Sequence, residues 1–310
     1  MLHKNRIIMA KIGTDPYPTD PVPTEGADAM LMRDSSFVPQ PQTVTLRYDR
    51  PNSGAGKEFI TGKFATLSGI IDMAPSGTAG TPPAWGPLMR MCSWAETVDS
   101  GVSVAYTLVR PDLSEWGGMY FNLGEELHKL LGVRGTVDFT FDAAGMPQAQ
   151  FQMQGLWDLT PVTAVQGAVD YSAFEDPLPI NKVNTPTFTI DGYAAKMSAL
   201  SLSQGNTVEY SNIVNEEAIR ITDREMTGNC TIDAPALSDK DFWALIRGRN
   251  VVNTQLVHGQ TAGSILTLDL KTQLMINSAH GDRQGIATLP LNMRCIPTPG
   301  SNDEATLTLT

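Results

Sequence analysis

The residue types that most often carry catalysis or hold metals are scattered along this chain. The four histidines stand far apart in the sequence: His3, His128, His258 and His280. None belongs to an HxH or HxxxH pair, the spacings that bring two imidazoles to one metal ion. The adjacent carboxylates Glu125-Glu126 and Glu216-Glu217 could hold a divalent cation, but neighbouring side chains point in different directions on a helix or a strand. We therefore expect solvated surface at both pairs and no metal site.

Sequence motifs of known catalytic chemistry are also missing. The chain has no GxSxG nucleophile elbow, no HExxH zinc motif and no Walker A loop. Gly54 and Gly56 lack the rest of a dinucleotide-binding fingerprint and lie between two predicted strands. These observations predict a protein that is not an enzyme, with no catalytic residue and no cofactor.

The polar residues that do form a pattern lie in two long loops. Residues 49–57 follow a strand-like run that ends in Tyr48, and residues 211–223 follow one that ends in Tyr210. Loops of this length on a small β-domain usually have a function unless they are disordered. We interpret them as equivalent extensions that contact neighbouring subunits, with mobile decoration as the alternative.

These loops belong to an internal repeat. In each half the loop leads to a Thr-Gly pair, at residues 61–62 or 227–228, and then to Trp85 or Trp243. The spacing differs mainly by an insert rich in glycine and proline at residues 75–83. An internal repeat indicates duplicated structural units. Duplicated β-domains more often build architecture than carry out chemistry.

Alternation of apolar and polar residues, the signature of half-buried strands, dominates the rest of the chain. The clearest case is a hairpin that reverses at residues 142–145, with alternate residues of 137–141 and 149–153 facing inward. Residues 265–270 and 285–293 predict a closing pair of strands. Pro290 within the second run indicates an edge or bulged strand, because proline cannot donate to the ladder.

Helical signals are few. Residues 238–248 have Ser238 as a candidate N-cap and end in glycine, and residues 125–132 also end in glycine. Residues 85–91 form an apolar stretch headed by Trp85, and we expect both Trp85 and Trp243 to anchor their helices in the core. The predicted fold class is mainly β, with two tandem β-sandwich or barrel-like domains that each carry a short flanking helix.

The predicted domain boundaries follow shifts in composition. Residues 14–29 contain four prolines, which favours an extended, solvated arm over residues 1–30; such an arm could also order on a neighbouring subunit. The first β-domain spans residues 31–165 and the second spans 184–310, each long enough for a core of its own. Residues 166–183 show little periodicity and form the predicted linker.

The net charge of −11 is spread evenly along the chain. Residues 1–165 carry 12 basic and 17 acidic side chains, and residues 166–310 carry 10 and 16. Without a basic patch, sequence-specific nucleic-acid binding is not expected. An acidic surface keeps a protein soluble, and it also repels DNA.

Cysteine usage and hydropathy indicate where the protein is made. Cys92, Cys230 and Cys295 are odd in number and far apart, which argues for a reducing compartment and against a disulfide framework. The N-terminal apolar run is too short for a signal peptide. No segment approaches the roughly 18 apolar residues of a transmembrane helix. We expect a protein made in the cytoplasm, with no direct membrane insertion.

With matched long loops, a repeated strand–loop–strand unit and no catalytic cluster, the chain resembles the major tail tube proteins of long, non-contractile-tailed bacteriophages, in their duplicated-domain form. The matching positions are the units at residues 44–67 and 207–232, the tryptophan helices at 85–91 and 238–247, and the hairpins at 137–153 and 265–293. In that family six β-sandwich domains make a ring, and rings stack through long loops into a tube with an acidic lumen that passes DNA. Two domains per chain imply a trimeric ring.

The resemblance implies a structural virion protein made in the host bacterial cytoplasm. Its partners would be copies of itself, as homotrimeric stacked rings, together with tape-measure, tail-tip and tail-terminator proteins. The residues expected at inter-ring contacts are Asp49, Arg50, Asn52, Lys57, Asn215, Glu216 and Glu217. The residues expected to face the lumen are Asp138, Asp142 and Asp269. The proline-rich arm departs from a minimal tube domain.

The alternative is a β-sandwich module of a tail tip or an adhesin that binds carbohydrate or another surface. Such a module would be a monomer with exposed aromatic side chains in a shallow groove. Only 7% of the residues are aromatic, and most of them fall inside alternating strands. The composition therefore favours the tube protein.

Overall fold

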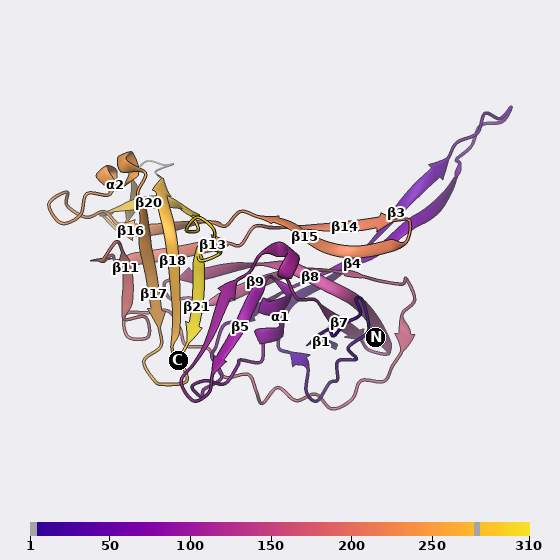
Figure 1. The fold of residues 1–310 in the computed structure, drawn as a ribbon, viewed down its shortest axis with the longest axis horizontal. Coiled ribbons are helices and arrows are strands. Elements are labelled where there is room, and N and C mark those ends of the chain that lie inside the picture. The colour runs from indigo at the N-terminus through magenta and orange to yellow at the C-terminus, as the bar shows by residue number, and fades with distance from the viewer. Residues whose placement is uncertain (1–4, 276–279) are drawn as a thin grey trace.

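Antiparallel strands make up most of the computed structural model, which describes residues 5–275 and 280–310 (Figure 1). The mainly β fold class is therefore confirmed. The helices within these residues are short: α1 (Gly86–Met91), α2 (Phe242–Gly248) and a 3₁₀ turn, η1 (Pro111–Leu113). In this part of the chain no helix is long and apolar enough to cross a membrane. His3 lies outside the described residues.

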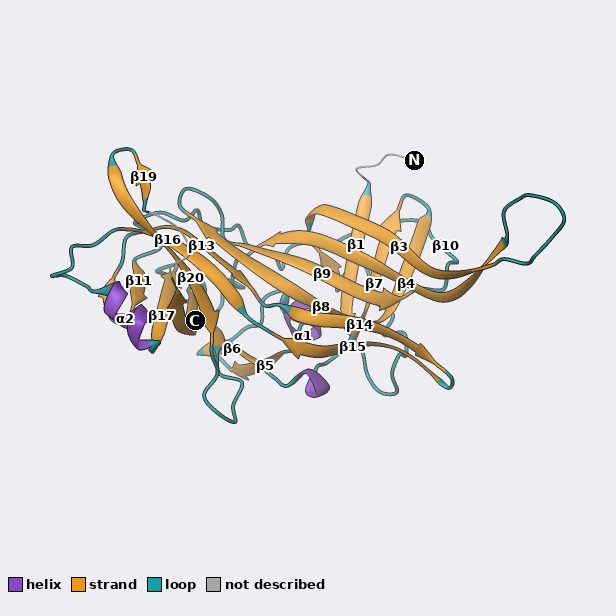
Figure 2. Ribbon diagram, turned by 90° about the horizontal axis from the view of Figure 1, so that it is seen from above, coloured by secondary structure: helices purple, strands orange, loops and turns teal. Residues whose placement is uncertain are grey.

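One curved sheet crosses the whole molecule, and Figure 2 looks onto it. In spatial order its strands are β3 (Arg33–Leu46), β4 (Lys57–Asp72), β9 (Gln148–Leu156), β8 (Glu126–Asp142), β13 (Met197–Ser203), β16 (Thr227–Asp233) and β20 (Ile286–Cys295). Beyond β20 the sheet ends in β18 (Leu266–Met275) and β19 (Gly281–Arg283), which both pair with β20. The two halves of the chain meet where β8 pairs with β13, with Thr140 opposite Ser201.

The remaining strands lie beneath this sheet or beside it. A smaller sheet contains β2 (Ala29–Met30), β1 (Arg6–Ile12), β7 (Gly117–Leu123), the first part of β8, and β10 (Val162–Thr163). A wall on the other side of the molecule contains β5 (Trp94–Asp99), β6 (Ser103–Leu108), β21 (Ala305–Leu309), β18, β17 (Val251–His258), β11 (Thr187–Ile190) and β12 (Tyr193–Ala194). The hairpin of β14 (Asn206–Ile213) and β15 (Glu216–Arg224) pairs only within itself among the described strands.

A single apolar cluster runs through both halves. Among its largest fully buried side chains are Trp85, Trp94, Phe139 and Phe151 from the first half and Phe242 from the second. The C-terminal strand β21 pairs with β6 on one side and with β18 on the other, so it also joins the halves. The expectation that each half has a core of its own is therefore wrong. Residues 166–183 contain no strand and connect the halves along the surface.

Residues 125–132, expected as a helix, form the end of a turn at Glu125 and the first part of β8 instead. Gly124 adopts φ +64° in the turn between β7 and β8, a conformation that glycine reaches without strain. Leu123 then pairs with Glu126, and the ladder continues to Gly117 opposite Val133. Long-range pairing has overridden a local pattern that fits either structure, as happens with short apolar runs.

The other two predicted helices exist. α1 buries Trp85 at its N-terminus, as expected. α2 begins four residues after Ser238, because the Asp241 carboxylate caps it by accepting a hydrogen bond from the Ala244 amide at 2.9 Å. Phe242 then fills the core position, so Trp243 remains 44% exposed and its predicted role as a core anchor is wrong.

The segment expected as a solvated arm is folded onto the first half. β1 pairs with β7 along its whole length, and residues 7–10 are buried. The proline-containing stretch after β1 is held by Asp20, whose carboxylate accepts hydrogen bonds from Tyr120 and from Lys129. β20 also differs from expectation: it is not an edge strand, because β16 flanks it on one side and β18 and β19 flank its two ends on the other.

Candidate functional site

The two halves repeat one pattern of strand pairing. In the first half, the β3–β4 hairpin pairs through β4 with β9, and β9 pairs with β8. In the second half, the long hairpin of β13–β14 and β15–β16 pairs through β16 with β20, and β20 pairs with β18 and β19. A short helix follows the second strand of the hairpin in each half, α1 after β4 and α2 after β16. The chain therefore contains two topologically equivalent units.

The pairing also fixes the register of the repeat. Residues 60–72 align with residues 221–233 without a gap, because Asp72 and Asp233 pair with equivalent positions on β9 and β20. Both hairpins contain a bulge at the same place, at Thr61 and at Thr222. Thr61 is thus equivalent to Thr222, so the match of the two Thr-Gly pairs seen in the sequence is out of register.

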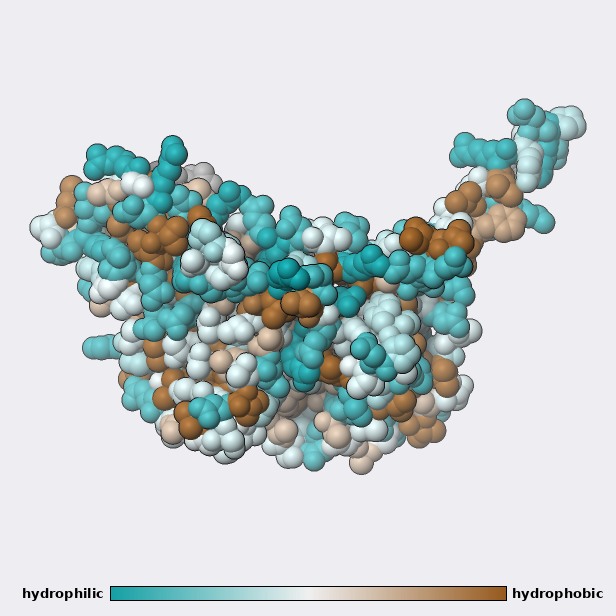
Figure 3. Space-filling view, viewed as in Figure 1, coloured by the Kyte–Doolittle hydropathy of each residue, from teal (hydrophilic) through white to brown (hydrophobic). Residues whose placement is uncertain are grey.

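One face of the long sheet is open and polar, because alternate residues point away from the core. Residues directly opposite each other share this face across the junction between halves, as Gln150, Asp138, Ser203 and Thr227 do. Its amide side chains are Gln148, Gln150, Gln152, Gln154, Asn229 and Asn292. Its hydroxyl side chains are Thr66, Ser68, Thr136, Thr140, Ser201, Ser203, Thr227 and Thr231. This side of the molecule is hollowed like a saddle, and much of it is hydrophilic (Figure 3).

Charged side chains of both signs lie on the open face, and none of its outward strand positions described above is a lysine. Its acidic residues are Asp72, Asp138, Asp142 and Asp233. Its basic residues are Arg134, Arg294, Arg33 and Arg283, of which Arg33 forms an ion pair with Asp72 and Arg283 with Asp233. Asp138 and Asp142, two of the residues expected to face a lumen, both lie on this face. Asp269 does not lie in this part of the sheet: it stands on β18 opposite Gln255 and Thr306, where β18 pairs with β17 and β21.

The two expected long loops have different structures. Residues 47–56 do form a loop, at the tip of a β3–β4 arm that projects from the body (Figure 1). The first loop's predicted contact residues, Asp49, Arg50, Asn52 and Lys57, are exposed there. Residues 211–223 instead lie almost wholly in strands β14 and β15, which turn at residues 214–215. The prediction of a second long loop is wrong because cross-strand pairing continues through these polar residues.

The β14–β15 hairpin is docked on the first half of its own chain. Ile219 is fully buried, and the Tyr210 ring stacks on Phe64 of β4 with centroids 4.6 Å apart. The Tyr210 hydroxyl accepts a hydrogen bond from the Lys63 amide at 3.1 Å, and Asn212 donates one to the Thr61 carbonyl at 2.9 Å. The remaining predicted contact residues are exposed at the hairpin's tip: Asn215, Glu216 and Glu217.

Tyr17 fastens this hairpin from the other side. Its hydroxyl accepts a hydrogen bond from the Ile219 amide at 2.8 Å and donates one to the Gly132 carbonyl at 3.2 Å. The Arg134 guanidinium lies over the Tyr17 ring at 5.3 Å and donates to the Ile219 carbonyl. Burial raises the pKa of Tyr17 and lowers the pKa of Arg134, although the neighbouring phenol partly offsets the change at Arg134. The sequence carried no signal for this contact, since Tyr17 lies more than 100 residues from each of its partners and Arg134 lies 85 residues from Ile219.

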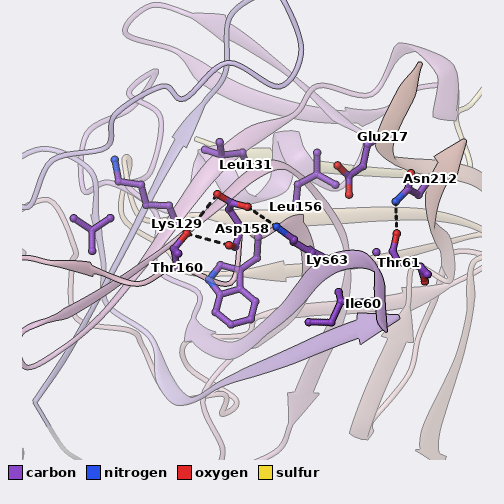
Figure 4. A pocket seen from close by; sticks show the side chains of 13 residues that line it. Ile60, Thr61, Lys63, Lys129, Leu131, Leu156, Asp158, Thr160, Asn212 and Glu217 are labelled. Atoms are coloured by element: carbon purple, nitrogen blue, oxygen red, sulfur yellow. Dashed lines mark hydrogen bonds and ion pairs between the residues drawn. The ribbon is translucent and has the colours of Figure 1, made fainter. Parts of the chain in front are cut away.

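A pocket of about 580 Å³ opens between β4, the end of β9 and the tip of the docked hairpin (Figure 4). Lys63 and Asp158 form an ion pair across it at 2.9 Å, and Thr160 donates a hydrogen bond to Asp158. The Lys63 ammonium lowers the pKa of the Asp158 carboxyl. Glu217 lines the far side. No histidine or cysteine is among the residues that line this pocket.

Titratable groups that could bind metal do not converge in residues 5–275 and 280–310, where no group of three His, Cys, Asp or Glu side chains is close enough to share an ion. Cys92, Cys230 and Cys295 are free and buried, and burial raises the pKa of Cys230 and of Cys295 to about 12. Such thiols are poor nucleophiles.

No protein-family model matches the chain, and no curated protein matches it.

Proposed function

We propose that this chain is a structural protein that assembles with copies of itself into rings, and that the rings stack into a phage tail tube through which DNA passes. Each chain supplies two equivalent positions in the ring, so three chains complete six. The proposed site of action is the virion tail, after synthesis in the cytoplasm of the host bacterium. The further partners proposed are the tape-measure, tail-tip and tail-terminator proteins.

The observation that carries the proposal is the junction inside the chain. There the end of β8 in the first unit pairs with β13, the first strand of the second unit. The equivalent strands at the two ends of the sheet lack such a partner: among the described strands β3 pairs only with β4, and β19 only with β20. Unpaired edges are prone to pair with another chain, and a head-to-tail contact that closes makes a ring.

The register of the internal junction predicts the register between copies. Thr140 is equivalent to Gly281, since Thr140 pairs with Gln148 and Gly281 with Thr288. Ser201 is equivalent to Ser36, since Ser201 pairs with Asn229 and Ser36 pairs with the equivalent residue, Ser68. The Thr140–Ser201 pair within a chain therefore corresponds to a Gly281–Ser36 pair between chains. Beyond this point Pro39 and Pro41 limit further edge pairing.

The open face supports the same function. A ring closed through these edges turns the polar face into a continuous inner surface. Neutral amides, hydroxyls and aspartates offer DNA phosphates little to bind. The arginines of this face have partners within the chain: Arg33 pairs with Asp72, Arg283 with Asp233 and Arg294 with Glu225, and Arg134 donates to the Ile219 carbonyl. The proposal needs no catalysis.

A crosslink between copies tests the closure. Cα atoms of directly opposed strand residues lie within the range that a disulfide spans. A mixture of the single variants Ser36→Cys and Gly281→Cys is expected to give disulfide-linked dimers that assemble into rings visible by electron microscopy. The double variant Thr140→Cys/Ser201→Cys is the matched control and crosslinks within one chain. Monomers without dimers or rings at high protein concentration would refute the proposed assembly.

A further inference from the structure

The two equivalent hairpins are in different situations. β14–β15 lies across the sheet of the unit beside it, whereas the equivalent part of β3–β4 projects into solvent (Figure 1). An isolated two-stranded hairpin is marginally stable in water. Docking supplies β14–β15 with buried surface at Ile219 and Ile221, which are 0% and 5% exposed. The projecting arm has no such cover within its own chain.

The projecting arm carries a set of apolar side chains that are about half exposed. They are Val44, Leu46, Tyr48, Phe59 and Ile60, with exposed fractions of 37–64%. Figure 3 shows hydrophobic surface on the part of the arm nearer the body and at its base, whereas the tip is hydrophilic. Apolar side chains gathered on a protruding element mark an interaction surface. Val44, Leu46 and Phe59 lie on one face of the arm. Ile60 lies on the other face with Thr45 and Glu58, and this second face is equivalent to the docked face of β14–β15, which carries Tyr210 and Ile219.

The repeat identifies the surface that the arm fits. The docked hairpin contacts the first unit at Phe64 on β4 and at Arg134 on β8, and Gln154 on β9 stands opposite Arg134. The equivalent residues of the second unit are Glu225, Gln273 and Arg294, by the same strand pairings. These three line one groove, with a volume of about 490 Å³ and Ile296 at its side.

We infer that the β3–β4 arm of one copy docks in this groove of the neighbouring copy in the same ring. The inference rests on the proposed function, and it makes the arm a lateral contact within a ring, where the sequence predicted a contact between rings. It also explains why the arm projects from its own chain: the groove that holds it lies on the neighbouring copy.

The residues on the two sides of the contact change together between the repeats. In the internal contact, Tyr210 of the hairpin stacks on Phe64. In the contact between copies, the equivalent residues are Thr45 on the arm and Glu225 in the groove. A polar pair therefore replaces the aromatic pair. Glu58 of the arm likewise replaces the buried Ile219, and it would meet the polar Gln273 and Arg294 in the groove.

Single-cysteine variants test the docking. A mixture of Thr45→Cys and Glu225→Cys proteins is expected to form disulfide-linked dimers under mild oxidation once the protein assembles. The double variant Tyr210→Cys/Phe64→Cys is the intrachain reference and should crosslink at any dilution. Thr45→Cys mixed with Asp239→Cys, an exposed residue outside the groove, is the negative control and should remain uncrosslinked. Cys92 and Cys230 are buried, but Cys295 lines the groove, so all variants are made with Cys295→Ser to remove this competing thiol.

The outcomes separate this inference from the proposed function. A Thr45–Glu225 crosslink in assembled protein, without the Asp239 crosslink, supports the docking. Rings that form normally without a Thr45–Glu225 crosslink overturn the docking and leave the proposed function standing. Protein that stays monomeric at every concentration, without crosslinks between copies, overturns both.

Discussion

Arg224 shows how one side chain ties the two halves of the chain together. Its guanidinium donates to Glu304 at 2.8 Å and to the Val109 carbonyl at 2.7 Å, and both partners of the ion pair are about 5% exposed. The equivalent residue of the first unit, Lys63, forms an exposed pair with Asp158 instead. The repeat therefore provides a buried and an exposed version of the same position.

We predict that Arg224→Ala lowers the free energy of unfolding by about 3–5 kcal/mol, because it leaves the Glu304 carboxylate buried without its partner. Lys63→Ala, at the equivalent exposed site, should change it by about 1 kcal/mol or less. Urea denaturation of both variants measures the difference. Equal effects of the two substitutions would contradict the assigned burial.

His258 makes stability depend on pH. Its side chain is buried, its Nδ1 lies 2.8 Å from the Thr185 hydroxyl, and burial lowers its pKa below the ordinary value of 6.5. The unfolded chain therefore takes up a proton at higher pH than the folded chain does. Stability should be complete above about pH 6.5 and fall as the pH drops through that value.

His258→Gln should flatten this dependence when melting temperature is followed from pH 7.5 to 5. We assign any change of melting temperature with pH that remains in the variant to His128, whose pKa is also lowered by burial. An unchanged slope after both histidines are replaced would contradict the assignment.

At the scale of the elements, Tyr17 holds the β14–β15 hairpin in its docked position. Tyr17→Phe removes the hydroxyl that accepts from the Ile219 amide and leaves that amide without its acceptor. We predict a loss of about 1–3 kcal/mol in stability and faster hydrogen exchange in β15. Exchange in the β3–β4 arm of the monomer should be fast in both proteins, so it serves as the internal reference. Unchanged exchange in β15 would show that Tyr17 does not hold the hairpin.

Strands were predictable from the sequence where one face of the strand is buried by its own sheet. The alternation at residues 137–141 and 149–153 predicts β8 and β9 with the correct inward faces. The same reasoning failed at residues 211–223, because that hairpin is buried by distant residues such as Tyr17 and Phe64 and its own sequence is polar. It also failed at residues 125–132, whose apolar spacing fits a helix as well as a strand.

The candidate assembly surfaces were less predictable than the strands. Asp138 and Asp142 could be placed on an outward face from alternation alone. The register of the repeat could not be predicted from alternation. Thr61 and Thr222 are recognised as equivalent because each forms the bulge of its hairpin, and the position of a bulge depends on the pairing between strands. The groove at Arg294 and Glu225 depends on that register, so it emerged only from the structure.

For the whole molecule, the polar face determines how DNA would pass. We predict that Asp138→Lys/Asp142→Lys leaves ring formation intact, because both side chains lie on the open face outside the apolar cluster. Assembled variant rings should bind DNA in a manner that weakens steeply with salt, whereas unmodified rings should not bind it. Filter binding of labelled DNA between 50 and 300 mM salt, roughly the range over which such contacts are screened, measures this. If the variant rings and the unmodified rings retain equal amounts of DNA on the filter, these aspartates do not face the lumen.

In the proposed assembly one chain supplies two ring positions, and copies of the chain close into a ring. Native mass spectrometry of the concentrated protein tests this assembly, with each chain contributing 33.5 kDa. We predict assemblies whose masses are multiples of three chains, with six equivalent units around a central hole in electron micrographs. A protein that remains a monomer, or that closes into rings of another number of chains, would refute this assembly.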